Sequence, residues 1–465
     1  MHLKKYLPLL LMITAYLVLW NHNWYTDDQE TLVRSFFIND LYFKQWSVHF
    51  PFVALINSLI DSMIGSTWVG NRLVALAVNL MAVIVVVDIV NRFNKNQNVP
   101  LLNEASLVNT VLFYAPFLCF ITNSNSYANI TAIWAMLGII LMVWTLDFRS
   151  DQVRVRFPIW FGIFMAMAVF SRVMNIVQAG LICIYLLGIF RAIDFKVFFK
   201  IIFGFLILAL PQLFWLWQKK SMNDFLYWTL LHNYNVKKSL SMIGYLGQVT
   251  VPQVGTFWLL FAFSLLCLWK NKKLNLIAGF FIVSFLGGIL SANPSGLNTS
   301  LQHGLPSIPL LALLLALSIA PENEVNKKII YFRGIVLIAV AICTFRSIGF
   351  MRSDDVSKIK AKTMLDAEII KAKTKPSDKI MLFGVNPIIY LYAERSSGSF
   401  DSILLPDLVP YESKILTDLA NENVKCVYIE DEGGWTDLNR EVFKRSYDYA
   451  TSQFTKINER IFCRL

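Results

Sequence analysis

Long apolar runs recur from the beginning of the sequence to about residue 348. Most are roughly 15–25 residues long, which is the length that a helix needs to cross a bilayer. The mean hydropathy of the whole chain is +0.53, well above that of a soluble domain. These runs predict a polytopic α-helical membrane protein. We place about eleven spans, near residues 6–20, 67–90, 101–121, 128–147, 157–171, 173–190, 198–217, 255–269, 274–291, 305–320 and 330–348.

The boundary between the fifth and sixth spans rests on two polar residues. Residues 157–190 are almost continuously apolar, but Ser171 and Arg172 interrupt them. An arginine at mid-bilayer is costly, so we expect a helix break at a water-facing surface there. With this break, the segments expected to be cytoplasmic contain 15 lysines and arginines and the outer loops contain 7. The asymmetry predicts a cytoplasmic N-terminus and an extracytoplasmic C-terminal segment.

The composition changes after residue 348. Residues 349–465 contain 18 of the 31 acidic residues, and helix-like segments alternate with strand-like ones. Helical patterns cover 356–373, 387–392, 412–423 and 437–452, and strand patterns cover 379–384, 425–430 and the last eleven residues. This order predicts a small α/β domain with a partly parallel sheet. We therefore divide the chain into a membrane domain, residues 1–348, and a tail domain, residues 349–465.

Two adjacent carboxylates follow the first span. Asp27 and Asp28 lie in a part of the chain that is poor in acids, since residues 1–348 hold only 13 of the 31. Amphipathic patterns come next, at 31–41 and at 51–64, where Asp61 lies. They predict short helices in the membrane interface of the first outer loop. The pair could act chemically, or one member could simply cap a helix that begins at Gln29.

Four motifs, taken in order, resemble those of the GT-C superfamily of polytopic glycosyltransferases, which includes the protein O-mannosyltransferases and the bacterial lipid A aminoarabinose transferases. They extend over most of residues 1–320. They are Trp24–Asp28, the stretch from His49–Phe52 to Trp68–Leu76, Ala168–Arg172 and His303–Pro309. Many members carry another acidic residue in the outer loop before the fourth span, whereas residues 123–129 here contain none.

The resemblance implies a glycosyltransferase. It would move a hexosyl or pentosyl group from a polyprenyl-phosphate donor to a lipid, glycan or protein acceptor. The reaction would take place at the outer face of the bacterial plasma (inner) membrane. Two other classes were weighed against it: a lipid-linked sugar flippase or transporter, and a polysaccharide polymerase or ligase. Transporters usually have broken helices at matching places in two halves of the chain, and this sequence shows no such matched pair. A polymerase or ligase would have a late outer loop rich in arginine and histidine, whereas the 292–304 loop has one histidine and no arginine.

Sugar transfer from a lipid phosphate requires a base for the acceptor hydroxyl and cations for the leaving phosphate. Asp27 or Asp28 is the candidate base. The candidate phosphate-binding residues are Arg172, His303, Lys219, Lys220, Lys237 and Lys238. The candidate residues for binding the acceptor or sugar are Asp61, His232 and Tyr234. Arg172 leads the cations because its position demands polar surroundings, although a purely structural arginine is the alternative.

Metal, cofactor and nucleic-acid chemistry have little support in the sequence. No cysteine or histidine spacing is typical of a metal site, so we expect no metal and no cofactor. The excess basic charge belongs to the membrane loops, which indicates contact with membrane lipids and not with nucleic acid. Cys426 and Cys463 in the tail could form a disulfide in an oxidising compartment or remain buried thiols.

Overall fold

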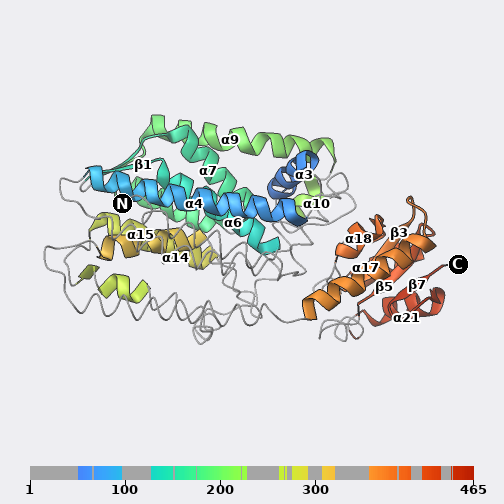
Figure 1. Ribbon diagram of the computed structural model, residues 1–465. Helices are drawn as coiled ribbons and strands as arrows, with labels where there is room; N and C mark the ends of the chain where they lie inside the picture. Colours follow the sequence, from blue (N-terminus) through green and yellow to red (C-terminus); the bar gives the residue numbers. More distant parts are fainter. Residues whose placement is uncertain are drawn as a thin grey trace.

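The computed structural model describes part of the chain. The described residues are 51–64, 68–96, 127–149, 152–173, 175–220, 222–227, 261–266, 268–269, 275–291, 306–319, 355–384, 387–399, 411–430, 441 and 443–464. Figure 1 shows a bundle of long helices and, at one end of it, a smaller α/β unit made by the C-terminal residues. The predicted spans 6–20, 101–121 and 330–348, and the predicted domain boundary at 348/349, lie outside the described residues.

The described part of the membrane domain is helical. Its helices are α3 (Phe52–Ile64), α4 (Trp68–Asn96), α6 (Tyr127–Trp144), α7 (Pro158–Ser171), α8 (Asn175–Gly188), α9 (Phe195–Gln218), α10 (Met222–Leu226), α14 (Leu276–Ser291) and α15 (Ile308–Ile319). Among the residues described, Leu73–Val90 of α4 and the whole of α9 are long and apolar enough to cross a membrane. Shorter apolar helices accompany them in α6, α7, α8 and α14. The expected total of eleven spans stays a prediction.

Small residues let the central helices approach closely. A Cβ atom on Gly162 of α7 would overlap the carbonyl oxygen of Ile201 in α9, and one on Gly204 of α9 would overlap that of Ile159 in α7. A Cβ on Gly138 of α6 would come within 2.7 Å of the backbone of α7. Glycines at helix crossings are typical of membrane bundles, where backbone-to-backbone packing replaces the hydrophobic effect. The opposite side of α9 exposes a row of phenylalanines, which suits a lipid-facing helix.

A hairpin that the sequence analysis did not foresee follows α6. Strands β1 (Leu146–Arg149) and β2 (Gln152–Val155) pair antiparallel, with Leu146 opposite Val155. Helix α6 ends at Trp144, close to the predicted end of this span near residue 147. The missed signal is the alternation from Gln152 to Val155, in which Val153 and Val155 are buried and Gln152 and Arg154 are exposed. A period of two residues is typical of a half-buried strand.

The tail is an α/β domain, as the sequence predicted. The sheet has the order β4-β3-β5-β7-β6. Its strands are β3 (Lys379–Phe383), β4 (Ser396–Ser397), β5 (Val424–Ile429), β6 (Thr455–Lys456) and β7 (Ile461–Cys463), and its helices are α17 (Asp355–Lys373), α18 (Ile388–Ala393), α19 (Glu412–Ala420) and α21 (Lys444–Gln453). Strands β4 and β5 are parallel to β3, and β7 runs antiparallel to β5. The predicted partly parallel sheet is confirmed.

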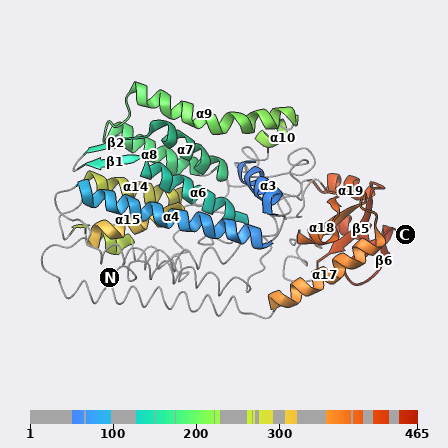
Figure 2. The ribbon, with the colours of Figure 1, turned by 45° about the horizontal axis from the view of Figure 1, so that its top comes forward.

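Apolar residues fill both faces of this sheet. Met381 and Phe383 of β3 pack in one core with residues of α19 and α21, whereas Ile380 and Leu382 pack in a second core with α17 and α18. Neighbouring residues of a strand point to opposite faces, so a strand covered on both sides must be apolar throughout. Figure 2 shows the sheet together with its helices, of which α17 and α18 cover one face and α19 and α21 the other.

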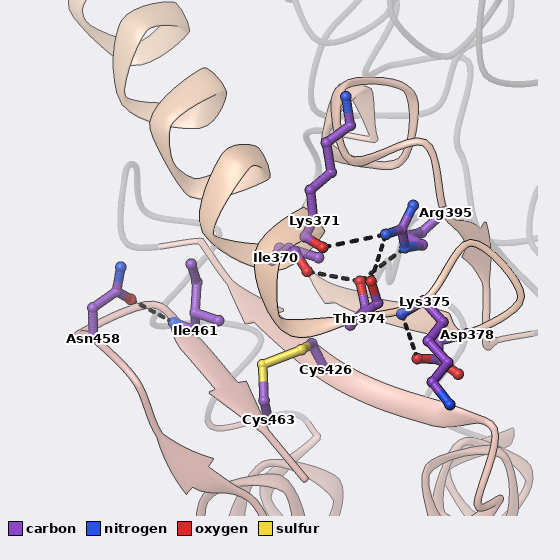
Figure 3. Close-up of a disulfide and its surroundings, with 10 residues drawn as sticks. All are labelled: Ile370, Lys371, Thr374, Lys375, Asp378, Arg395, Cys426, Asn458, Ile461 and Cys463. Carbon is purple, nitrogen blue, oxygen red and sulfur yellow. Dashed lines mark hydrogen bonds between the residues drawn. A yellow bond between two sulfur atoms is a disulfide. The ribbon is translucent and has the colours of Figure 1, made fainter. Parts of the chain in front are cut away.

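A disulfide joins two neighbouring strands in the second core. Cys426 of β5 and Cys463 of β7 are paired in register and bonded through their sulfur atoms, as Figure 3 shows. Both residues are buried. This resolves the choice that the sequence left open in favour of the disulfide. Nearby, the guanidinium of Arg395 donates to the carbonyl oxygens of Lys371 and Thr374, which satisfies backbone acceptors at the end of α17.

Candidate functional site

The predicted break at Ser171 and Arg172 is present. Helix α7 ends at Ser171, and Arg172 is extended, with φ −154° and ψ 110°. The Arg172 N–H donates to the Ala168 carbonyl at 3.2 Å, and its own carbonyl accepts from the Asn175 N–H at 2.9 Å, where α8 begins. These bonds close the end of one helix and open the next, so the chain turns sharply without leaving those backbone groups unsatisfied.

Arg172 is buried although it lies at a helix end, with only 5% of its surface exposed. Polar residues that are as deeply buried accompany it along the same stretch: Ser171, Asn175 and Gln178. The Ser171 hydroxyl donates to the Met167 carbonyl at 2.7 Å, and the Asn175 amide reaches the Ala168 carbonyl at 3.5 Å. A buried guanidinium inside a membrane bundle is expensive unless its surroundings are polar. The break therefore gathers four buried polar residues along one stretch of the bundle.

Helix α15 begins next to this polar stretch. The Gln178 amide nitrogen lies 3.5 Å from the carbonyl oxygen of Pro306, and the Ser307 hydroxyl donates to the Phe285 carbonyl of α14 at 3.2 Å. Pro306 follows the predicted site residue His303 by three positions. His303 itself lies outside the described residues. The structure thus brings Gln178 of α8, the helix that follows the Arg172 break, into contact with Pro306, three positions after His303.

Helix α3 and the end of α9 meet at a second place. Ala54 of α3, Leu216 of α9 and Phe225 of α10 form one small apolar core. Asp61 lies on α3, in the expected helix, but the position of its side chain is not among the described features. Lys219 ends α9 and Lys220 follows it with a left-handed backbone, φ 55°. The helices that carry Asp61 and these two lysines are therefore neighbours.

The tail domain touches the membrane domain near these lysines. The hydroxyl oxygens of Tyr227, just after α10, and Tyr411, just before α19, are 2.6 Å apart. Figures 1 and 2 both show the tail at the end of the bundle where α3 and α10 lie. Tyr227 also begins the segment that carries His232, Tyr234, Lys237 and Lys238, which are all outside the described residues. The tail is thus docked beside the first residue of that segment.

The most important prediction is not tested. Asp27 and Asp28 lie outside the described residues, so the position of the proposed base relative to Arg172 stays a prediction. Within the described residues, no group of three or more histidine, cysteine, aspartate or glutamate side chains is placed to hold a metal ion.

The sequence analysis missed Asn175, Gln178 and Ser307. Ser171, Asn175 and Gln178 follow one another at intervals of four and three residues in an apolar run. Residues at that spacing share one helix face. Asn175 and Gln178 therefore share one face of α8, whereas Ser171 lies on α7, before the break. Two polar residues at helical spacing in an apolar run were the signal for this buried face.

Comparison with known proteins supports the fold and little else directly. No protein-family model matches the sequence, and no curated protein matches it. Among solved structures, ArnT from Cupriavidus metallidurans in the apo state has a TM-score of 0.60 at 11% identity, covering 98% of this chain and 97% of that one. ArnT bound to undecaprenyl phosphate has a TM-score of 0.61 at 12% identity, with the same coverage.

An archaeal protein gives a third match. The oligosaccharyltransferase AglB from Archaeoglobus fulgidus, in complex with an inhibitory peptide and a dolichol-phosphate, has a TM-score of 0.53 at 12% identity. The alignment covers 97% of this chain and 73% of AglB. The chain therefore shares the fold of ArnT and AglB, which is the fold that its motifs predicted. At these identities the likeness establishes the fold alone.

Proposed function

We propose that the chain is a membrane glycosyltransferase that moves a sugar from a polyprenyl-phosphate donor to a lipid, glycan or protein acceptor. The observation that carries the proposal is the buried Arg172 at the α7–α8 break, in a fold shared with ArnT. Helix α8, which begins after this break, contacts Pro306 through Gln178. Two of the structural neighbours are complexes with undecaprenyl phosphate or dolichol-phosphate, so this fold accommodates lipid phosphates. A guanidinium suits such a group because its planar fork matches phosphate oxygens.

The reaction needs two protein groups. Asp27 or Asp28 takes the proton of the acceptor hydroxyl as that oxygen attacks the anomeric carbon. The bond between the anomeric carbon and the phosphate oxygen breaks, and the phosphate leaves with the electron pair. Arg172 stabilises the charge that develops on the phosphate, helped by His303 and by lysines of the set Lys219, Lys220, Lys237 and Lys238.

The proposed location is the outer face of the bacterial inner membrane, with the N-terminus in the cytoplasm. The buried Cys426–Cys463 disulfide supports an extracytoplasmic tail, because disulfides persist in oxidising compartments. The hairpin between α6 and α7 carries Arg149, Arg154 and Arg156 at the opposite end of α7 from the break. That distribution agrees with the positive-inside rule.

Removal of the proposed base tests the proposal. The full-length protein in lipid nanodiscs would receive a panel of undecaprenyl-phosphate sugars with bacterial membrane extract as the source of acceptor. Release of undecaprenyl phosphate would be followed by mass spectrometry. We expect Asp27→Asn or Asp28→Asn to abolish release at normal expression, and Asp40→Asn, the control in the same loop, to retain it. Full activity in both variants would remove the base assignment.

A further inference from the structure

One buried glutamine bridges three elements of the membrane domain. Gln178 of α8 has no exposed surface. Its amide nitrogen donates to the Ser284 carbonyl of α14 at 3.0 Å and lies 3.5 Å from the Pro306 carbonyl, just before α15. A buried amide that lost these acceptors would carry the full desolvation penalty of its N–H groups, so the three elements are held together at this residue.

The side chains of Gln178 and Ser307 pack closely against Gly288 of α14. A Cβ atom on Gly288 of α14 would lie 2.5 Å from the Gln178 amide nitrogen and would overlap the Ser307 hydroxyl. The Ser307 hydroxyl in turn donates to the Phe285 carbonyl. Glycine at position 288 therefore leaves the space that the two side chains occupy, and the start of α15 is attached to α14 and to α8 at the same level.

We propose that Gln178 is a positioning residue for the glycosyl transfer. It lies two helical turns or fewer beyond the Arg172 break, and Pro306 lies three positions after His303. By fixing α8 against α14 and the start of α15, Gln178 holds the Arg172 break, from which α8 begins, in its position relative to these helices. This inference rests on the proposed function, and it adds a residue that has no direct contact with the substrate.

Loss of the Gln178 contacts should slow cleavage of the bond between the sugar and the phosphate. Charge on the phosphate grows as the bond to the sugar breaks, so misplaced cations weaken the transition state more than the bound donor. Displacement of a catalytic group by about 1 Å can lower rates by up to ~100-fold. We expect loss of the Gln178 contacts to lower kcat by about 10-fold or more and to change the KM for donor by less than about 2-fold.

Gln178→Met is the sharpest variant, because methionine keeps the length and most of the volume but cannot donate. Gln212→Met is its matched control. Gln212 is also buried, but its amide donates at 3.0 Å to Leu208 of its own helix, and within the described part of the chain it has no hydrogen bond to a second element. Gly288→Ala disturbs the same contacts from α14. Gly180→Ala, on α8, is the control for it, because a Cβ there meets nothing within 4 Å.

Two measurements on the full-length protein in nanodiscs decide the matter. Hydrogen–deuterium exchange of peptides covering 306–319 should rise in Gln178→Met and Gly288→Ala, and should stay at the wild-type level in both controls. Transfer from an undecaprenyl-phosphate sugar should show the fall in kcat in the same two variants only. Unchanged exchange in Gln178→Met and Gly288→Ala, or raised exchange with unchanged kcat, would overturn the inference.

Failure of the proposed function would look different. In that case the wild-type protein would not release undecaprenyl phosphate from any donor, while the exchange comparison would still show whether Gln178 holds the start of α15. Loss of transfer in Asp27→Asn or Asp28→Asn with normal exchange at 306–319 would support the base assignment independently of Gln178.

Discussion

The hydroxyl oxygens of Tyr227 and Tyr411 lie 2.6 Å apart and join two parts of the chain that are 184 positions apart in sequence. Tyr227 follows α10 in the membrane domain, and Tyr411 precedes α19 in the tail. The next tail residue, Glu412, accepts a hydrogen bond from the Ser446 N–H at the start of α21. Tyr411 therefore precedes a helix, α19, that is itself hydrogen-bonded to α21.

We predict that this contact contributes to docking of the tail. Tyr227→Phe and Tyr411→Phe should each lower the stability of the full-length protein by about 0.5–1.5 kcal/mol, because each removes one hydrogen bond. The double variant should be as stable as the less stable of the two single variants, since each substitution removes the same hydrogen bond. Thermal unfolding of the three variants measures this coupling. Fully additive losses would show that the two hydroxyls do not interact.

Arg172 should be sensitive even to a conservative change. Lysine keeps the charge but loses the planar fork that can hold two phosphate oxygens. We predict that Arg172→Lys lowers kcat by about 10- to 100-fold in the undecaprenyl-phosphate assay, with normal expression. Arg191→Lys, at the other end of α8 and exposed, is the control and should keep wild-type activity. Wild-type turnover in Arg172→Lys would show that Arg172 has a purely structural role.

Local patterns predicted most elements of the described fold, because apolar runs and breaks are local. Ser171 and Arg172 were enough to separate α7 from α8, and the short apolar runs after Lys379 and Lys425 were enough for β3 and β5. The hairpin at 146–155 was missed because its polar residues resemble an ordinary loop. The contacts of Gln178 could not be predicted, since they depend on how α14 and α15 pack, which is non-local.

The candidate site was predictable in part for the same reason. The cost of an arginine at mid-bilayer marked the break at Arg172 from the sequence alone. The sequence predicted a water-facing surface at this break, whereas Arg172 is buried among polar residues of the bundle. The acid-poor surroundings of Asp27 and Asp28 marked the pair, but only their three-dimensional position could show whether they face Arg172, and they lie outside the described residues. The disulfide was an open choice because cysteine spacing does not determine pairing, whereas the register of β5 and β7 does.

Reduction of the disulfide should weaken the tail domain. The bond between Cys426 and Cys463 closes a loop with a sequence separation of 37, so its loss should cost about 2–4 kcal/mol. We predict a lower unfolding temperature for the double variant Cys426→Ser/Cys463→Ser than for wild type. Cys183→Ser, which changes a free cysteine of α8, is the control. Equal unfolding temperatures in the presence and absence of reductant would contradict the prediction.

The tail also contains a buried ion pair that fixes its last hairpin. The Arg460 guanidinium lies 2.7 Å from a carboxylate oxygen of Asp366 in α17, with 10% and 3% of the two side chains exposed. The Asn458 amide donates to the other oxygen of Asp366 at 3.2 Å. The pair thus attaches the turn between β6 and β7 to α17.

We predict that Arg460→Met destabilises the protein by about 3–5 kcal/mol at neutral pH, because it leaves the Asp366 carboxylate buried without its counter-ion. Asp366→Leu/Arg460→Met should be closer to wild type, since it removes both charges. Burial raises the pKa of Asp366 above its usual value, although Arg460 and Asn458 act in the opposite direction. The folded protein therefore holds this proton more tightly than the unfolded chain does.

The pH dependence follows from that difference. The stability gained from protonating Asp366 is fully present below the unfolded pKa, about 4, and is lost as the pH rises through the higher folded pKa. The unfolding temperature of wild type should accordingly fall relative to Asp366→Asn, which does not titrate there, as the pH increases over this range. Thermal scans of both proteins at matched ionic strength measure the difference. A wild-type protein that gains stability relative to Asp366→Asn over the same range would instead mean that attraction to Arg460 outweighs burial at this carboxylate.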